Sequence, residues 1–238
     1  MVLLPDGRLA PSAAAVPRGG CTADRCAPTP PGGARLVPAR EAGEHGLTER
    51  EREVLGYLHL GYTNQQIAAA LGSAPRTVRN QLSSAYAMRA LGYSLKGQYD
   101  SAISDYDAAI RINPDFAVAL NNRAWAYFRS GRAQQGLPDV ERSLKLNPLS
   151  EHSWDTRAHI RQASGNFTGA FDDYEKAVQI GGERMIRLYQ CGLKENGLYN
   201  GPVDGLYTTD VRAALRTCSK TTTCDPLPAD EQCRAATS

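Results

Sequence analysis

The chain has 238 residues, a formal net charge of +2 at pH 7 and 42% hydrophobic residues. This near-neutral balance excludes a general polycation, so any binding of nucleic acid has to come from a local basic patch. No apolar run is long enough to span a bilayer, which argues against membrane insertion, and the length allows one to three small domains.

Residues 1–46 are rich in Ala, Pro and Gly and show no periodic spacing of apolar residues. Such a segment cannot bury enough surface to offset the entropy lost on ordering, so we expect it to be disordered. Its first residues lack a basic region, and Pro5 and Pro11 interrupt the apolar ones, which makes a poor secretory signal. We therefore expect a cytoplasmic protein. The alternative is the periplasm, if the true N-terminus carries a signal peptide.

Residues 47–83 predict three short helices separated by tight turns. Thr48 with Glu51, and Thr63 with Gln66, have the spacing of capping boxes that open the first two helices. Pro75 suits the first turn of the third, on which Val78 and Leu82 are expected to face the core. The residues expected to point outward from this third helix are Arg76, Thr77, Arg79, Asn80 and Ser83. Arg and Asn side chains on a helix after a tight turn suit the major groove of DNA.

The segment LTEREREVLGYLHLGYTNQQIAAALGSAPRTVRNQL (residues 47–82) resembles the LuxR-type helix-turn-helix of bacterial DNA-binding regulators. The resemblance implies double-stranded DNA as a partner, with Arg79 and Asn80 at base edges and Arg76, Thr77 and Ser83 at phosphates. Ala74 replaces the usual Ser or Thr cap, and four Arg stand against three Glu, so we expect a loose helix start and weak, salt-dependent binding. The alternative is a three-helix packing module with incidental arginines.

The join to the next unit bears on how this segment could pair. LuxR-type domains usually dimerise through a fourth helix, and here that stretch, residues 84–93, is also expected to be the first helix of the following unit. Tyr86 and Tyr93 cannot both pack inside that unit and pair with a second copy. If they pack inside, half-site pairing has to come from elsewhere, or the protein binds DNA as a weak monomer.

Residues 84–184 show an internal repeat with a period of 34 residues. Arg89, Arg123 and Arg157 follow this period, as do Gly97, Gly131 and Gly165. A turn glycine and small residues at fixed positions predict three helical hairpins that stack on one another. The pattern resembles three tetratricopeptide repeats, of which the last ends at Gly181-Gly182 instead of Asn-Pro.

The resemblance implies a concave groove that binds a protein or peptide. The residues expected to line it are Ala87, Leu91, Asn121, Trp125, Phe128, Asp155 and His159. Trp125 and Phe128 lie one turn apart, and they serve either as anchors for a partner or as packing between hairpins. His152 and His159 are seven residues apart, which does not suit metal binding on a helix, so we expect them on a solvated surface.

Residues 185–238 predict an amphipathic helix over 185–196 and a second helix capped by Thr208 or Thr209. The inner face of the second is expected to be Val211, Ala214 and Leu215. The segment GLYNGPVDGLYTTDVRAAL (residues 197–215) resembles a small peptidoglycan-binding module, although Arg216-Thr217-Cys218 departs from its usual ending. The alternative is a cap that seals the apolar face of the last repeat.

Four of the six cysteines (Cys191, Cys218, Cys224 and Cys233) lie near the C-terminus. They suit disulfides in an oxidising compartment, whereas in a reducing cytosol they would be thiols. Zinc is the least favoured reading, because the spacing lacks the paired Cys knuckles of structural sites.

Nothing in the sequence points to catalysis. The four His stand apart, no nucleophile or phosphate-binding motif is present, and the pairs Asp105 and Asp107, and Asp172 and Asp173, are expected on solvated helix faces. We expect a non-enzyme without cofactor or metal. The predicted fold is all-α: a helix-turn-helix, an α-solenoid of three hairpins and a small helical C-terminal module.

Two functions fit this organisation. The first is a DNA-binding transcriptional regulator with a repeat domain for protein interaction. The second is a non-catalytic cell-envelope scaffold that binds proteins, with peptidoglycan as a further ligand, through the repeats and the C-terminal module.

Overall fold

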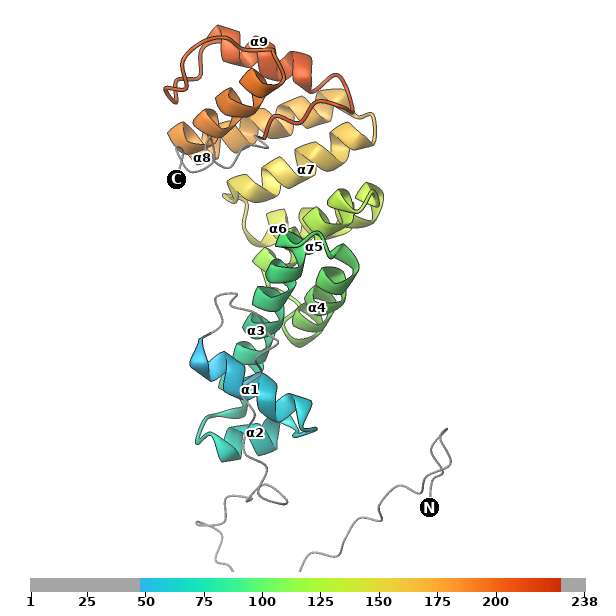
Figure 1. The fold of residues 1–238 in the computed structure, drawn as a ribbon, viewed down its shortest axis with the longest axis vertical. Helices are drawn as coiled ribbons and strands as arrows, with labels where there is room; N and C mark the ends of the chain where they lie inside the picture. The colour runs from blue at the N-terminus through green and yellow to red at the C-terminus, as the bar shows by residue number, and fades with distance from the viewer. Residues whose placement is uncertain (1–47, 228–238) are drawn as a thin grey trace, which may run out of the picture. The chain divides into compact units, whose positions relative to one another are not determined.

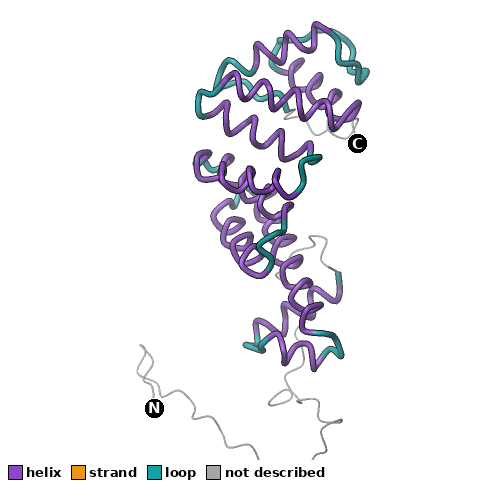
Figure 2. Tube along the Cα trace, turned by 180° about the vertical axis from the view of Figure 1, so that it is seen from behind, coloured by secondary structure: helices purple, strands orange, loops and turns teal. Residues whose placement is uncertain are grey.

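The computed structural model describes residues 48–227, and this part of the chain contains helices and loops but no strand (Figures 1 and 2). Its helices are α1 (Glu49–His59), α2 (Asn64–Ala70), α3 (Pro75–Leu95), α4 (Tyr99–Ile112), α5 (Ala117–Arg129), α6 (Ala133–Leu146), α7 (Glu151–Ala163), α8 (Phe167–Glu195) and α9 (Thr209–Cys218). None of these helices is long and apolar enough to cross a membrane. The all-α prediction is confirmed. The disorder expected for residues 1–46 lies outside the described residues, as does Cys233.

The first three helices form the predicted small core. Both capping boxes are present: the Thr48 and Thr63 side chains accept the backbone N–H of Glu51 and Gln66. Val54, Ile67, Val78 and Leu82 are almost fully buried in one cluster. The apolar spacing of these residues therefore places one face of each helix against the other two.

Helix α3 runs without a break through the boundary that we placed between residues 83 and 84. Residues 76–91 include no Gly or Pro, so nothing in the sequence ends the helix after the turns that carry Arg76 and Arg79. Tyr86 packs against the cluster of the first three helices and also against that of the first repeat. One helix is thus shared by the two units.

The repeats form three helical hairpins, made by α3 and α4, by α5 and α6, and by α7 and the first part of α8 (Figure 1). Gly97, Gly131 and Gly165 take positive φ angles of 73°, 77° and 78° at the hairpin turns. A residue with a Cβ is strained in this conformation, which explains why glycine recurs there. In the second hairpin a Cβ on Gly136 would lie 2.7 Å from the Ala124 carbonyl oxygen, so this glycine lets α5 and α6 approach closely.

Each hairpin is closed by a bidentate ion pair that joins its two helices. The guanidinium groups of Arg89, Arg123 and Arg157 contact the carboxylates of Asp105, Asp139 and Asp173. The expectation that Asp105 and Asp173 are solvated was wrong, because they are 7% and 2% exposed. An aspartate can be buried here because the arginine opposite neutralises its charge and satisfies both oxygens.

The C-terminal part packs on the third repeat. Gly182 has non-helical angles inside α8 and separates the last repeat helix from the amphipathic helix that follows. Thr208 caps α9, and Val211, Ala214 and Leu215 are buried as predicted. They belong to one cluster with Phe171, Tyr174, Met185 and Tyr189 of α8. This is the packing expected of a cap that seals the apolar end of the repeats.

Candidate DNA-reading helix and repeat groove

The N-terminal turns of α3 present polar side chains to solvent. Arg76, Thr77, Arg79 and Asn80 are exposed, while Val78 lies in the core between them. Neither arginine forms an ion pair with a described residue. These side chains are therefore available to an external partner with acceptor groups.

Ser83 does not belong to this surface, and our prediction of a phosphate contact there was wrong. The residue is 1% exposed, and its hydroxyl donates to the Ala109 carbonyl oxygen at 3.0 Å. Because α3 continues into the first hairpin, α4 covers the face that carries Ser83.

The start of α3 lacks a side-chain cap, as Ala74 led us to expect. The turn before α3 is instead stabilised by a side chain of α1. The Arg50 guanidinium donates to the Leu71 carbonyl oxygen at 2.6 Å and to the Ser73 hydroxyl at 2.8 Å. Arg50 also pairs with Glu53 at 3.0 Å, so this arginine is already engaged within the domain.

Some of the predicted groove residues line a cavity, whereas others are packed between helices. Leu91, Trp125 and Asp155 line a cavity of about 900 Å³, and Asn121 lines a smaller one of about 360 Å³ together with Trp125. Ala87 is buried within the first hairpin, and Phe128 packs against Ala124, Val140 and Ile160. Trp125 therefore stays at the groove, whereas Phe128 takes the alternative role of packing between hairpins.

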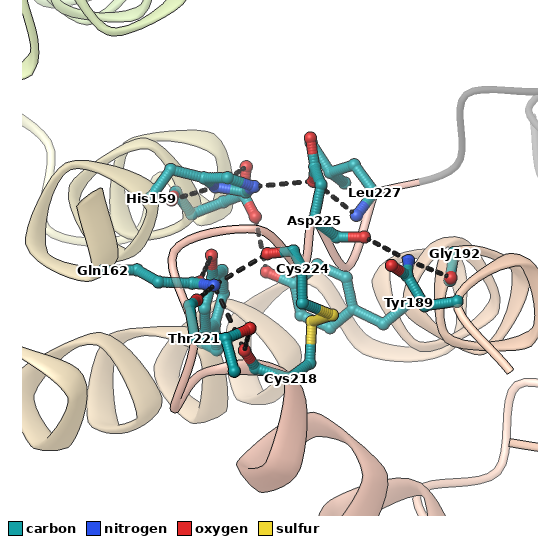
Figure 3. Close-up of polar contacts among 12 residues, drawn as sticks. His159, Gln162, Tyr189, Gly192, Cys218, Thr221, Cys224, Asp225 and Leu227 are labelled. Carbon is teal, nitrogen blue, oxygen red and sulfur yellow. Dashed lines mark hydrogen bonds and ion pairs between the residues drawn. A yellow bond between two sulfur atoms is a disulfide. The ribbon is translucent and has the colours of Figure 1, made fainter. Parts of the chain in front are cut away.

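His159 is buried, which corrects the expectation of a solvated histidine. It is 3% exposed, and its Nε2 lies 3.0 Å from Asp225 Oδ1 while its Nδ1 lies 2.9 Å from the Asp155 backbone oxygen (Figure 3). Burial by itself would lower the pKa of His159, but the carboxylates of Asp155 and Asp225 raise it to about 9. The imidazole is therefore charged at neutral pH and uses both nitrogens as donors.

The two aspartates beside His159 differ in their surroundings. Burial raises the pKa of Asp155, whose Oδ1 accepts the Tyr189 hydroxyl at 2.6 Å. Burial would also raise the pKa of Asp225, yet its contact with His159 lowers it. Asp225 is thus the ionised partner of the imidazolium at neutral pH.

Gln162 was missed by the sequence interpretation. Its side-chain nitrogen lies within hydrogen-bonding distance of the carbonyl oxygens of Cys218, Thr221 and Cys224 (Figure 3). Its oxygen accepts the Tyr174 hydroxyl at 2.6 Å, which fixes the orientation of the amide. The signal was available, since Gln162 follows Phe128 by one repeat period of 34 residues.

Cys218 and Cys224 form a disulfide, and Cys191 is disulfide-bonded as well. Of the three states left open by the sequence, the structure has the disulfide for these residues. Within residues 48–227, no group of His, Cys, Asp and Glu is arranged to hold a metal ion.

Comparisons with known families agree with two of the three expected units. Residues 45–88 match the model of the luxR family of bacterial regulatory proteins, and residues 93–131 match a tetratricopeptide repeat model. Two segments of the chain thus match a LuxR-type helix-turn-helix and a tetratricopeptide repeat. Both families are of non-catalytic kinds. Neither match reaches residues 185–238, so the resemblance to a peptidoglycan-binding module finds no support here.

No curated protein matches the chain. Among solved structures, a similar one is the first tetratricopeptide domain of Spaghetti (RPAP3) bound to an HSP90 peptide. It is 27% identical, has a TM-score of 0.42 and covers 42% of this chain and 80% of its own.

Proposed function

We propose that the chain is a DNA-binding transcriptional regulator that acts in the cytoplasm and recruits a protein through its repeats. The observation that supports this most is the outer face of α3, where Arg76, Arg79 and Asn80 are exposed beside the buried Val78. A helix of this kind fits the major groove. The LuxR-family match of residues 45–88 supports the same interpretation.

In this proposal the four exposed residues divide between bases and backbone. Arg79 reads a guanine through its O6 and N7 acceptors, and Asn80 reads an adenine through N6 and N7. Arg76 and Thr77 contact phosphates, which position the helix without selecting sequence.

The packing of α3 favours binding as a monomer. Tyr86 and Tyr93, on the stretch through which LuxR-type domains usually pair, pack against the core of the first hairpin. A second copy cannot use the same face. The protein would then contact one half-site with few basic residues, so its affinity should be modest and fall steeply with salt.

Replacing Arg79 with Ala should weaken binding to a selected duplex by roughly 10- to 100-fold and relax the preference at one base pair. Fluorescence anisotropy with the selected duplex and with its single-base variants measures both effects. Arg76→Ala is the matched control, because loss of a phosphate contact should weaken binding to all duplexes alike and reduce the salt slope by about one. An equal loss on selected and random DNA for Arg79→Ala would reject the base-reading role.

The repeat groove supports the second part of the proposal. Asn121 is 8% exposed, and its side-chain Oδ1 has no hydrogen-bond partner among the described residues. An unsatisfied buried acceptor at a cavity is suited to the backbone N–H of an extended peptide. Leu91 and Leu95, at 36% and 79% exposure, offer apolar contacts at the larger cavity. We propose an extended peptide with apolar side chains as the partner.

A second function is favoured by one observation, the Cys218–Cys224 disulfide. Structural disulfides persist in oxidising compartments, which would suit a non-catalytic cell-envelope scaffold that binds proteins through the repeats. Cell fractionation with thiol labelling distinguishes the two. A periplasmic protein whose cysteines stay blocked to labelling would favour the scaffold, and a cytoplasmic protein whose cysteines become labelled would favour the regulator.

A further inference from the structure

The segment after α9 packs against α7 and the C-terminal end of α8. We call residues 219–227 the strap. Its Thr223, Asp225 and Leu227 line the same cavity of about 900 Å³ as Leu91 and Trp125, so the strap forms one wall of the repeat groove. Figure 3 shows it between His159 and Gln162 of α7 and Tyr189 and Gly192 of α8.

The repeat holds the strap mainly by its backbone. Gln162 donates to carbonyl oxygens at both ends of the Cys218–Cys224 loop and inside it. Asn196 donates to the Asp225 carbonyl oxygen at 2.8 Å. Side chains of a groove that bond the main chain of an extended segment are the means by which peptides are generally recognised.

One side chain of the strap is recognised specifically. Asp225 pairs with the buried His159 at 3.0 Å, and that imidazole has Asp155 on its other side. The contact places an acidic group of the strap at a cation that is otherwise enclosed by the repeat. A segment that displaces the strap would need a carboxylate in place of the Asp225 side chain, so that the His159 imidazolium keeps a partner.

The strap also fits the surface of α8 closely. A Cβ added to Gly192 would overlap the carbonyl group of Pro226 and lie 2.8 Å from the carbonyl carbon of Leu227. Ala would be the better helix former at this position, but its Cβ would collide with the strap, which explains the glycine.

We propose that the strap is an internal ligand of the repeat groove, held in place by the Cys218–Cys224 disulfide, and that reduction opens this end of the groove to a partner. The partner is an extended segment with a carboxylate to pair with His159. The proposal rests on the proposed function in taking the groove as the protein-binding site. It also removes the conflict between a cytoplasmic DNA-binding unit and a disulfide, because the bond would then be a reversible switch.

The reductant is a dithiol. One of its thiolates attacks Cys224 Sγ, because Cys224 is half-buried whereas Cys218 is fully buried, and the S–S bond breaks to give a mixed disulfide. The second thiol displaces Cys224, so the dithiol ends as its own disulfide. The cysteine pair gains two electrons and two protons. Loss of a cross-link over a loop this short should make opening of the strap roughly 10- to 100-fold more frequent.

Amide hydrogen exchange on the full-length chain tests this directly. In the oxidised protein we expect slow exchange of strap amides that donate hydrogen bonds, those of Lys220, Thr221 and Leu227, and addition of a dithiol should accelerate it roughly 10- to 100-fold while α7 and α9 stay protected. Cys224→Ala should exchange quickly without dithiol and should not respond to it, which separates this bond from that of Cys191. Gly192→Ala should release the strap by steric overlap in the oxidised protein.

Three results would overturn the proposal. One is strap exchange that is equal in the oxidised and reduced protein. Another is a joint loss of protection in the strap, α7 and α9, which would mean that the bond stabilises the whole cap. The last is a strap in Cys224→Ala that still responds to dithiol. Neither DNA nor a partner is present in these samples, so failure here leaves the proposed function untouched.

Discussion

Replacing Arg123 with Met should lower the free energy of unfolding by about 3 kcal/mol, because it leaves a buried carboxylate without its counter-charge. The Arg123 side chain is 19% exposed and forms a bidentate pair with Asp139, which is 12% exposed. It also pairs with Asp107, so this arginine joins the first hairpin to the second. Urea-induced unfolding followed by circular dichroism measures the loss.

Two further variants show whether the cause is the unpaired charge. Arg123→Met combined with Asp139→Leu should recover most of the lost stability, since apolar groups of similar volume can replace a buried pair. Arg132→Met is the matched control, because its partner Asp100 is 89% exposed and such surface pairs contribute less than about 1 kcal/mol. If Arg123→Met and Arg132→Met destabilise the protein equally, the ion pair does not hold the hairpins together.

The His159–Asp225 contact should make stability depend on pH. The pKa of His159 is raised to about 9 from its ordinary value of 6.5. A raised pKa stabilises the folded state fully below pH 6.5, and this contribution is lost as the pH rises through 9. The difference corresponds to roughly 3 kcal/mol. On the acid side, the lowered pKa of Asp225 gives a contribution that is present above pH 3.8 and lost as the pH falls through the folded value. That contribution is smaller, because the Asp225 side chain is 51% exposed.

Comparison of the wild type with His159→Leu isolates this effect. The difference in unfolding free energy between the two should shrink by roughly 3 kcal/mol between pH 6.5 and pH 10, as the imidazole of the wild type loses its proton. Other groups that face His159, namely Asp155, Tyr174 and Tyr189, are present in both proteins. His152→Leu is the control, since its side chain is 59% exposed. A difference that stays constant over this pH range would show that His159 is not charged in the folded protein.

The local features of the fold were predictable because each depends on neighbours in sequence. Thr48 and Thr63 cap helices through residues three positions later, and the glycines of the hairpin turns follow from the left-handed conformation those turns require. The period of 34 residues predicted the hairpins because the same pattern of small residues and turn glycines recurs along the sequence. The same period contains Asp105, Asp139 and Asp173, and we placed Asp105 and Asp173 on solvated faces because an aspartate is normally buried only when it has a partner.

The candidate sites were predicted less completely. The outward face of α3 was correct for Arg76, Thr77, Arg79 and Asn80, since helical spacing relative to Val78 decides it. It was wrong for Ser83, because α4 covers that turn, and Ala109 of α4, which accepts the Ser83 hydroxyl, lies 26 residues further along the chain. Spacing on one helix does not show which other helix covers it.

The amino-acid order alone determined that residues 48–227 form a series of helices, with a unit like a DNA-binding domain followed by hairpins of fixed period. Only the tertiary structure decided that α3 serves both units and that residues 219–227 return to the groove. The bond between His159 and Asp225 joins positions 66 residues apart. The spacing of residues in the sequence does not predict such a contact, because its strength depends on the burial and the local charges that arise once the helices have packed.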